Sequence, residues 1–237
     1  MNTPSEIVAR AGRFGSADLA QQRGTIAQLA QLCQAWGAAI ATLHTTSTRR
    51  LPASLAPRPR VLSPWRLMPS TRDAAGGSGY AAVLEAFESS PDLRAAAIEV
   101  DQRWTEQHWI HGNLSASTVM VEEQPALRVS FLDLERAGLG DPAWDLASAV
   151  DAIIWLSPRW HALAQPLVDY LTLGYRRAGG PGRLYPAIQA VRALATAVWV
   201  AESPQEWTGQ EAQEEVGPWL DRARAYAARV GWLMAVA

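Results

Sequence analysis

The chain has 237 residues, 49% of them hydrophobic, and a formal net charge of -2. This composition allows a sizeable core, and arginines scattered among acidic residues give no basic surface for nucleic acid. The one cysteine, Cys33, excludes an intramolecular disulfide and a multi-cysteine metal site, which suits a reducing compartment. Neither an amino-terminal signal nor a membrane-spanning apolar run is apparent, so we expect a cytoplasmic protein without nucleic-acid or membrane partners.

The amino-terminal part predicts a short arm followed by a long helix. Residues 1–16 are too few for a sheet with its own core, so we expect an arm there. Residues 17–45 carry apolar side chains at helical spacing, which predicts one long helix with a buried face. That face comprises Leu19, Ile26, Leu29, Leu32, Trp36, Ile40 and Leu43. We expect the chain from residue 17 to residue 237 to form a single lobe.

The middle of the chain combines loops, helices and short strands. Proline and arginine make residues 51–69 an irregular connection, and glycine makes residues 75–79 a flexible turn. Helices are predicted from about 80 to 88 and from Pro91 to about 106. Short apolar or alternating runs predict the strands of small hairpins at 109–111, 118–122 and 126–132.

The carboxy-terminal part predicts helices only. Pro218 is expected to start or kink the last helix. The helical segments are 143–156, 158–178, 185–202 and 210–236. Together with the short strands, these segments predict a mainly α fold of the α+β class.

Three motifs follow one another in the middle of the chain. The first is His111-Gly112-Asn113 with Thr118 five residues after the asparagine; Asp133 ends an apolar run; and Gly140-Asp141-Pro142-Ala143-Trp144-Asp145 comes last. This series resembles the aminoglycoside- and choline-kinase-like phosphotransferases, whose hallmark is His-Gly-Asp-x-x-x-x-Asn, then an Asp on a strand, then Gly-Asp-Pro-x-x-Asp. The resemblance implies the large, carboxy-terminal lobe of a protein-kinase-like fold, with short β-hairpins around the catalytic loop.

Two working positions of that family are replaced in this chain. In kinases the catalytic-loop Asp accepts the proton of the attacking hydroxyl, the Asn five residues on holds magnesium, and the later Asp holds the metals on the phosphates. Asn113 stands at the base position, and its amide cannot take a proton at neutral pH. Thr118 is shorter than Asn. The resemblance therefore implies at most a residual metal site formed by Asp133 and Thr118.

The nucleotide-binding part of the family pattern is also missing. Family kinases hold the phosphates with a lysine on an amino-terminal strand, and this chain contains no lysine. Arginine is not interchangeable with lysine at such a site. The long helix over 17–45 resembles the first helix of the large lobe and leaves almost nothing ahead of it for a nucleotide lobe. We therefore expect no cofactor; magnesium and ATP or GTP would bind only if another chain supplied that lobe.

Other motif residues have structural or alternative roles. His111 is expected to support the loop through hydrogen bonds, and Asp145 to brace it from the following helix. In an active alternative, Asp141 or Glu135 would replace the missing base. His44, His108 and His161 lack metal-ligand spacing, and the glycine-rich stretches 12–16 and 76–79 lack the strand and lysine of a phosphate-binding loop.

Eleven tryptophans are unusual for this length. One interpretation makes them core and groove residues of a helical lobe. The other places Trp207, Trp219 or Trp232 on an exposed aromatic surface that receives a peptide or a partner subunit. Trp144, Trp207 and Glu135 are the candidates for substrate or partner binding.

These features predict a catalytically impaired pseudokinase that binds a peptide or partner protein in the former substrate cleft, within a hetero-oligomer. Residues 104–112 and 134–145 are similar to phosphotransferase-like proteins that accompany lyases in modifying ribosomally made peptides. That similarity implies a role in lanthipeptide- or thioamitide-like natural-product biosynthesis. The alternative is an atypical ATP- or GTP-dependent phosphotransferase acting on Ser or Thr of a peptide, or on a small-molecule hydroxyl, with the nucleotide lobe supplied by another chain.

Overall fold

A computed structural model describes residues 19–46, 56, 58–59, 62, 78–122, 127–156, 161–202 and 209–236. The chain divides into two compact units, the first comprising residues 1–57 and 105–183 and the second comprising residues 58–104 and 184–237. The arm predicted over residues 1–16 lies outside the described residues. The single lobe predicted over 17–237 would contain both units and stays a prediction.

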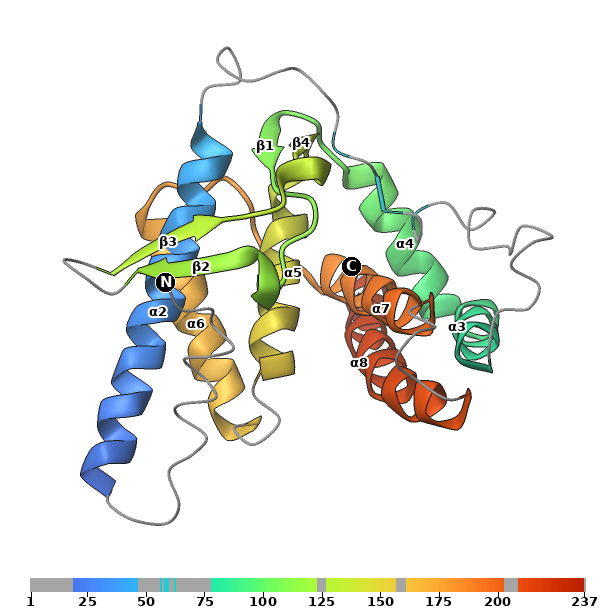
Figure 1. Ribbon diagram of the computed structural model, residues 1–237. Coiled ribbons are helices and arrows are strands. Elements are labelled where there is room, and N and C mark those ends of the chain that lie inside the picture. Colours follow the sequence, from blue (N-terminus) through green and yellow to red (C-terminus); the bar gives the residue numbers. More distant parts are fainter. Residues whose placement is uncertain are drawn as a thin grey trace. The chain divides into compact units, whose positions relative to one another are not determined.

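Three helices form the body of the first unit in its described part. Helix α2 (Leu19–Thr45) packs along α6 (His161–Arg177), and α5 (Pro142–Leu156) contacts both (Figure 1). Two glycines allow the close approach of α2 and α6. A Cβ on Gly37 would collide with the Leu171 carbonyl oxygen, and a Cβ on Gly174 with the Gln34 carbonyl oxygen. The predicted apolar face of the long helix is buried at Leu29, Leu32, Trp36 and Ile40.

The described residues of the first unit also contain two small antiparallel pairs of strands. Strands β2 (Val119–Glu122) and β3 (Arg128–Phe131) form a hairpin, with Val121 opposite Val129. Strands β1 (His108–Ile110) and β4 (Gly138–Gly140) pair across a long stretch of sequence. Short 3₁₀ turns, η4 (Ala116–Thr118) and η5 (Leu134–Arg136), lie between the strands. The hairpins predicted around the loop are therefore, among the described residues, one hairpin and one long-range pair.

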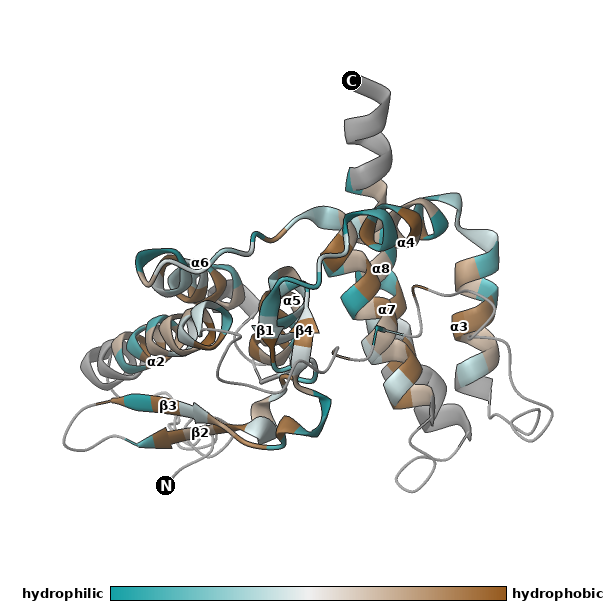
Figure 2. Cartoon of the chain, turned by 90° about the horizontal axis from the view of Figure 1, so that it is seen from above, coloured by the Kyte–Doolittle hydropathy of each residue, from teal (hydrophilic) through white to brown (hydrophobic). Residues whose placement is uncertain are grey.

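The second unit consists of helices in its described part. They are α3 (Ser78–Ser89), α4 (Pro91–Arg103), α7 (Pro186–Glu202) and α8 (Gly209–Val236). Each carries both hydrophobic and hydrophilic residues (Figure 2), and α7 packs against α3, α4 and α8. Helix α4 begins at Pro91, as predicted, and the Ser90 side chain caps it by accepting a hydrogen bond from the Leu93 amide.

The end of one helix differs from the prediction, and one of the two roles proposed for Pro218 is excluded. Helix α4 ends at Arg103 rather than near residue 106, because Trp104 leaves the helical region with φ -57° and ψ 125°. Helix α8 starts at Gly209 and continues through Pro218, so the proline does not start it. Among the described residues, no helix combines the length and apolar character that a bilayer span requires.

Candidate catalytic-loop site

The backbone of the loop after β1 is held by a buried carboxylate. Asp145, in the first turn of α5, accepts hydrogen bonds from the amides of His111 at 2.6 Å and Gly112 at 2.9 Å. Its Oδ2 also lies 3.1 Å from Nε2 of His44, and both side chains are fully buried. Three donors around one carboxylate offset the cost of burying its charge, and the helix amino terminus favours a negative charge. This geometry fits the bracing role predicted for Asp145.

His111 closes the same loop through its ring. Nε2 lies 2.6 Å from the Leu132 carbonyl oxygen, and Nδ1 accepts a hydrogen bond from the Asn113 amide at 3.3 Å. A carbonyl only accepts and this Nδ1 receives a proton donor, so the pattern fits the neutral tautomer protonated at Nε2. The ring connects the loop to the end of β3, which is a structural role.

Trp144 and Gly112 complete the packing behind the loop. The Trp144 indole N–H donates to the Gly112 carbonyl oxygen at 3.2 Å, and the side chain is buried. Gly112 has φ +78°, and a Cβ there would lie 2.5 Å from the Arg136 carbonyl oxygen. Only glycine satisfies both conditions without strain. Trp144, a predicted partner-binding residue, therefore has its polar group engaged with the loop.

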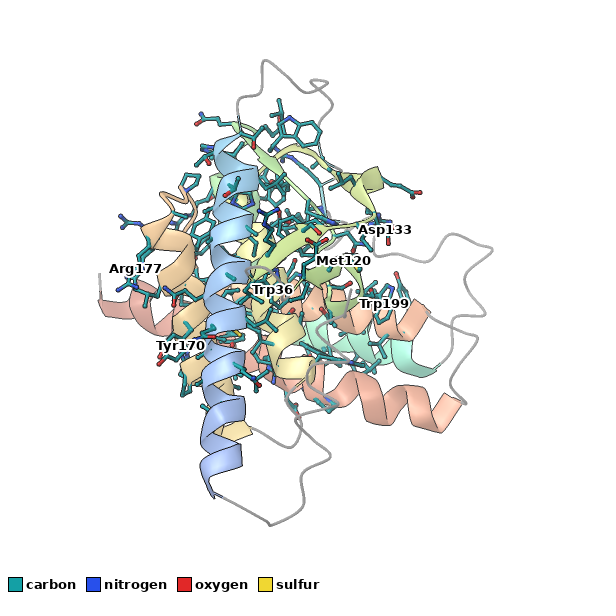
Figure 3. All side chains as sticks on the ribbon, turned by 60° about the vertical axis from the view of Figure 1, so that its left-hand side comes forward. Trp36, Met120, Asp133, Tyr170, Arg177 and Trp199 are labelled. Carbon is teal, nitrogen blue, oxygen red and sulfur yellow. The ribbon has the colours of Figure 1, made fainter. Side chains whose placement is uncertain are left out.

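The solvent side of the site is formed by a short exposed segment. Asn113 is exposed, and so are Asp133 and Glu135. Asp133 follows β3 (Figure 3) and adopts a left-handed backbone at φ 56°, which is uncommon outside glycine. The side chains on either side of it, Leu132 and Leu134, are 44% and 54% exposed. Polar and apolar groups therefore face solvent together beside the loop.

Thr118 lies on the opposite, buried side of the loop. It is 3% exposed, its hydroxyl donates to the Ser115 carbonyl oxygen at 3.0 Å, and it accepts from the Ser115 amide at 3.0 Å. Both hydrogen bonds join the Thr118 hydroxyl to the backbone of Ser115, the N-cap residue of η4. The hydroxyl proton and one lone pair are thus committed to the loop, which does not fit the metal-ligand role predicted for Thr118. Of the two predicted metal ligands, Asp133 alone faces solvent.

Asp141 caps the helix that carries Asp145. Its Oδ1 accepts from the Ala143 amide at 2.8 Å, its carbonyl accepts from the Trp144 amide at 3.0 Å, and the residue is 7% exposed. An aspartate at this position satisfies a free amide of the first helical turn. The geometry supports a capping role for Asp141 more strongly than the role of a replacement base.

A row of buried hydrogen bonds continues from Asp145 to residues for which the sequence analysis gave no role at the site. Nδ1 of His44 lies 2.8 Å from the Tyr175 hydroxyl, and that oxygen accepts from the Gly182 amide at 2.8 Å. With His44 protonated at Nε2, each group in the row has a partner: Gly182 donates to Tyr175, Tyr175 to His44, and His44 to Asp145. Burial is the main cause that raises the pKa of Tyr175, and the nearby Asp145 and Asp141 raise it further, so the hydroxyl stays protonated.

The sequence contains one signal for this row of hydrogen bonds, and it concerns His44. Trp36, Ile40 and His44 are spaced four residues apart and share one helix face, and all are buried. That spacing could have identified His44 as a core residue. Its partners Asp145 and Tyr175 are 101 and 131 residues away, and no local pattern identifies them.

The tryptophans differ in their exposure to solvent. Trp219 is buried, which contradicts its placement on an exposed aromatic surface. Trp207 lies outside the described residues, and the Trp232 side chain is not described. Trp155 and Trp199 are the tryptophans exposed among the described side chains.

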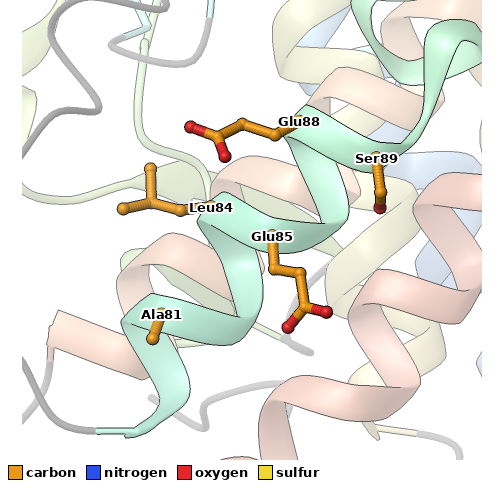
Figure 4. Close-up of a pocket in the computed structure, with 5 residues that line it drawn as sticks. All are labelled: Ala81, Leu84, Glu85, Glu88 and Ser89. Carbon is orange, nitrogen blue, oxygen red and sulfur yellow. The ribbon is translucent and has the colours of Figure 1, made fainter.

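The described part of the chain contains no metal cluster, and one pocket there lies away from the motifs. No group of three or more His, Cys, Asp or Glu side chains there is arranged to hold a metal ion. A shallow pocket on α3 is lined by Ala81, Leu84, Glu85, Glu88 and Ser89 (Figure 4). All five residues come from one helix of the second unit, and none belongs to the motifs. The loop between β1 and β2 is therefore the candidate site.

Comparison with known proteins agrees with the motif series. Residues 16–186 match the phosphotransferase enzyme family. This range contains α2, the four strands found among the described residues, α5 and α6. A search of curated proteins found no match.

Proposed function

The chain belongs to the phosphotransferase enzyme family, of the aminoglycoside- and choline-kinase-like kind, and we propose that it is a catalytically impaired member whose large-lobe scaffold binds a peptide or partner protein. The proposal rests on a contrast at the loop: the backbone is held in place, but side chains needed for phosphoryl transfer are replaced. Asp145, His111 and Trp144 hold the loop in place. The base and one of the two metal-holding groups are replaced, by the Asn113 amide and by the Thr118 hydroxyl, which is committed to the loop.

The missing base has the clearest chemical consequence. Asn113 is exposed beside the loop, where it can donate to or accept from a ligand hydroxyl, but its amide cannot remove a proton. A positioned general base contributes about 10²–10⁴-fold to such reactions. A ligand can therefore be oriented at Asn113 without being activated for transfer.

The exposed segment beside Asn113 supports binding. Leu132 and Leu134 offer apolar area, and Asp133 and Glu135 offer hydrogen-bond acceptors. Peptides and protein segments are bound by such mixtures of apolar contact and polar orientation. We propose that the ligand is a peptide of the kind modified by a partner lyase, in lanthipeptide- or thioamitide-like biosynthesis, within a hetero-oligomeric cytoplasmic complex.

The proposal is tested first by restoring the family residues. We expect that the double variant Asn113→Asp, Thr118→Asn shows no phosphoryl transfer from ATP or GTP to Ser- and Thr-containing peptides or aminoalcohols. The reason is that position 118 is buried, and the 237 residues contain no lysine for the phosphates. Radiolabelled transfer by the double variant alone would contradict the proposal.

Binding needs a separate experiment. A synthetic Ser/Thr-rich peptide library is titrated against the chain and against Leu132→Ser, Leu134→Ser. We expect the double variant to lose affinity about five- to thirtyfold, because about 1–2 kcal/mol of apolar contact is removed. Equal binding by both proteins would show that the peptide surface lies elsewhere.

One observation favours a second candidate function. Asp133 keeps the family's metal-binding residue in an exposed position, and Glu135 lies two residues away, also exposed. With a nucleotide lobe from another chain, Asp133 would bind magnesium and Glu135 would act as base for an atypical phosphotransferase. Transfer that requires a second chain and is abolished by Glu135→Gln would favour this function over simple binding.

A further inference from the structure

We propose that His44 and Tyr175 are positioning residues of the catalytic loop, and that they make the loop and the connection after α6 open as one cooperative unit. The inference concerns the control of the loop, so it rests on the proposed function only in taking residues 111–113 as the site. Its basis is a continuous line of buried hydrogen bonds from Gly182 to the loop amides.

The line joins four parts of the first unit. Gly182 lies after α6, Tyr175 near the end of α6, His44 near the end of α2, and Asp145 at the start of α5. Each step is a hydrogen bond of 2.6 to 3.1 Å. The side chains of His44, Tyr175 and Asp145 are almost completely buried. Losing one partner would leave the next group unsatisfied in the interior, so the bonds support one another.

The packing around the line restricts each side chain to one position. A Cβ on Gly180 would collide with the Tyr175 ring, and a Cβ on Gly182 would lie 3.0 Å from its hydroxyl and 2.8 Å from Cβ of Pro142. The His44 and Tyr175 rings meet edge to face at 5.5 Å. The His44 carbonyl also accepts from Nδ1 of His108 on β1. Movement of the 178–183 backbone therefore has to displace Tyr175, and through it His44 and Asp145.

The row of hydrogen bonds ends next to the connection between the two units, which suggests how the loop is regulated. Residue 183 is the last of the first unit, and the chain passes from there into the second. An event that pulls on this connection would withdraw the Gly182 donor from Tyr175. The loop that carries Asn113 would then lose the support of His44 on Asp145. The line thus offers a route by which binding elsewhere on the chain could change the loop.

Amide hydrogen exchange of the full chain tests the inference without any ligand. In the wild type, we expect Gly182, His111 and Gly112 to have protection factors within about fivefold of one another, because one opening exposes all three. A Gly182 amide that differs by more than this would show independent opening and overturn the proposal.

A matched pair of variants tests the positioning role. Tyr175→Phe removes only the hydroxyl from the line, and Tyr170→Phe removes one from the exposed side of the same helix (Figure 3). We expect Tyr175→Phe to speed exchange of the His111 and Gly112 amides by about tenfold relative to α7 amides such as Leu194, and Tyr170→Phe to leave the ratio unchanged. A uniform increase at all amides would indicate general destabilisation and contradict the proposal.

A spectroscopic readout separates positioning from packing. Imidazole ¹⁵N shifts should report His44 protonated at Nε2 in the wild type. In Tyr175→Phe we expect a changed Nδ1 shift, because the His44 ring loses the hydroxyl that donates to Nδ1. An unchanged Nδ1 shift would show that the hydroxyl does not hold His44. Because no phosphate or peptide is present in these experiments, their failure would leave the proposed function standing, and failure of the transfer assays would leave this inference standing.

Discussion

Asn113 occupies a backbone position that is fixed by its neighbours, although its side chain cannot perform acid–base chemistry. Its amide donates to His111, and the two preceding amides donate to Asp145. A loop that served only as a surface connection would not need a fully buried carboxylate behind it. The fixed backbone is thus consistent with a residue that orients a bound group rather than one that reacts.

Gly112 is the residue at which this loop is most sensitive to change. Gly112→Ala places a side chain at φ +78° and brings its Cβ within 2.5 Å of the Arg136 carbonyl oxygen. Gly179→Ala is the matched control, because Gly179 has φ +79° and nothing lies within 4 Å of its Cβ position. We expect Gly179→Ala to reduce the free energy of unfolding by about 1 kcal/mol and Gly112→Ala by about 2–4 kcal/mol, measured by urea denaturation. Equal losses would show that the Arg136 contact relaxes freely.

Cys33 gives a pH-dependent prediction. Burial raises the pKa of its thiol from 9.0 to about 12. The folded chain then holds the proton more tightly than the unfolded chain, so this contribution to stability is complete below pH 9 and is lost as the pH rises towards 12. We expect the difference in unfolding free energy between wild type and Cys33→Ala to fall across this range, by at most about 1.4 kcal/mol per pH unit. A constant difference would contradict the buried, protonated thiol.

At the scale of elements, the contact between α2 and α6 depends on two glycines. Gly174→Ala would drive a methyl group into the Gln34 carbonyl of α2, whereas Gly217→Ala on α8 meets nothing within 4 Å. We expect the first variant to lose about 1–3 kcal/mol of stability through overpacking. The second should change by less than about 1 kcal/mol, because the helix propensity of alanine and the restriction before Pro218 oppose each other. Thermal denaturation of both variants measures this, and similar stability for the two would refute the close contact.

Asp141 distinguishes a helix cap from a catalytic base. Asn caps helices as well as Asp but cannot take a proton, while Ala does neither. We expect Asp141→Asn to keep the unfolding free energy within about 0.5 kcal/mol and Asp141→Ala to lose about 1–2 kcal/mol. If an activity is found, its retention in Asp141→Asn would exclude Asp141 as the base, and its loss there without a change in stability would restore that role.

The elements that the sequence predicted are those with a strong local pattern. The helix over 17–45, the start of α4 at Pro91 and the β2–β3 hairpin follow from apolar spacing, capping and alternation. Strand β4 was missed because Gly138-Leu139-Gly140 has no strand propensity of its own, and its pairing with β1 is a tertiary effect. The end of α4 at Arg103 is likewise not marked by a breaker residue.

At the scale of the whole molecule, the motif residues 111–145 all belong to the first unit. The motif series predicted that these residues group around one loop, and the hydrogen bonds of Asp145 to the loop amides fit the bracing role that the resemblance implied. Burial and hydrogen-bond partners could not be predicted; the Thr118 hydroxyl bonds to the Ser115 backbone, and the Asp141 carboxylate bonds to the first turn of α5. The line through His44 and Tyr175 also depends on contacts across more than a hundred residues. The roles of Asp133, Glu135 and Trp207 in metal or partner binding stay predictions.

The central claim is that the loop has kept its backbone support while losing the groups needed for phosphoryl transfer. The most direct test is a thermal-shift titration of the chain with magnesium and ATP or GTP, with Asp133→Ala as the control. A ligand at a hundredfold excess over its dissociation constant would stabilise the folded chain by about 2.7 kcal/mol. We predict no change in melting temperature for either protein. A rise in the melting temperature of the wild type that Asp133→Ala abolishes would contradict the claim.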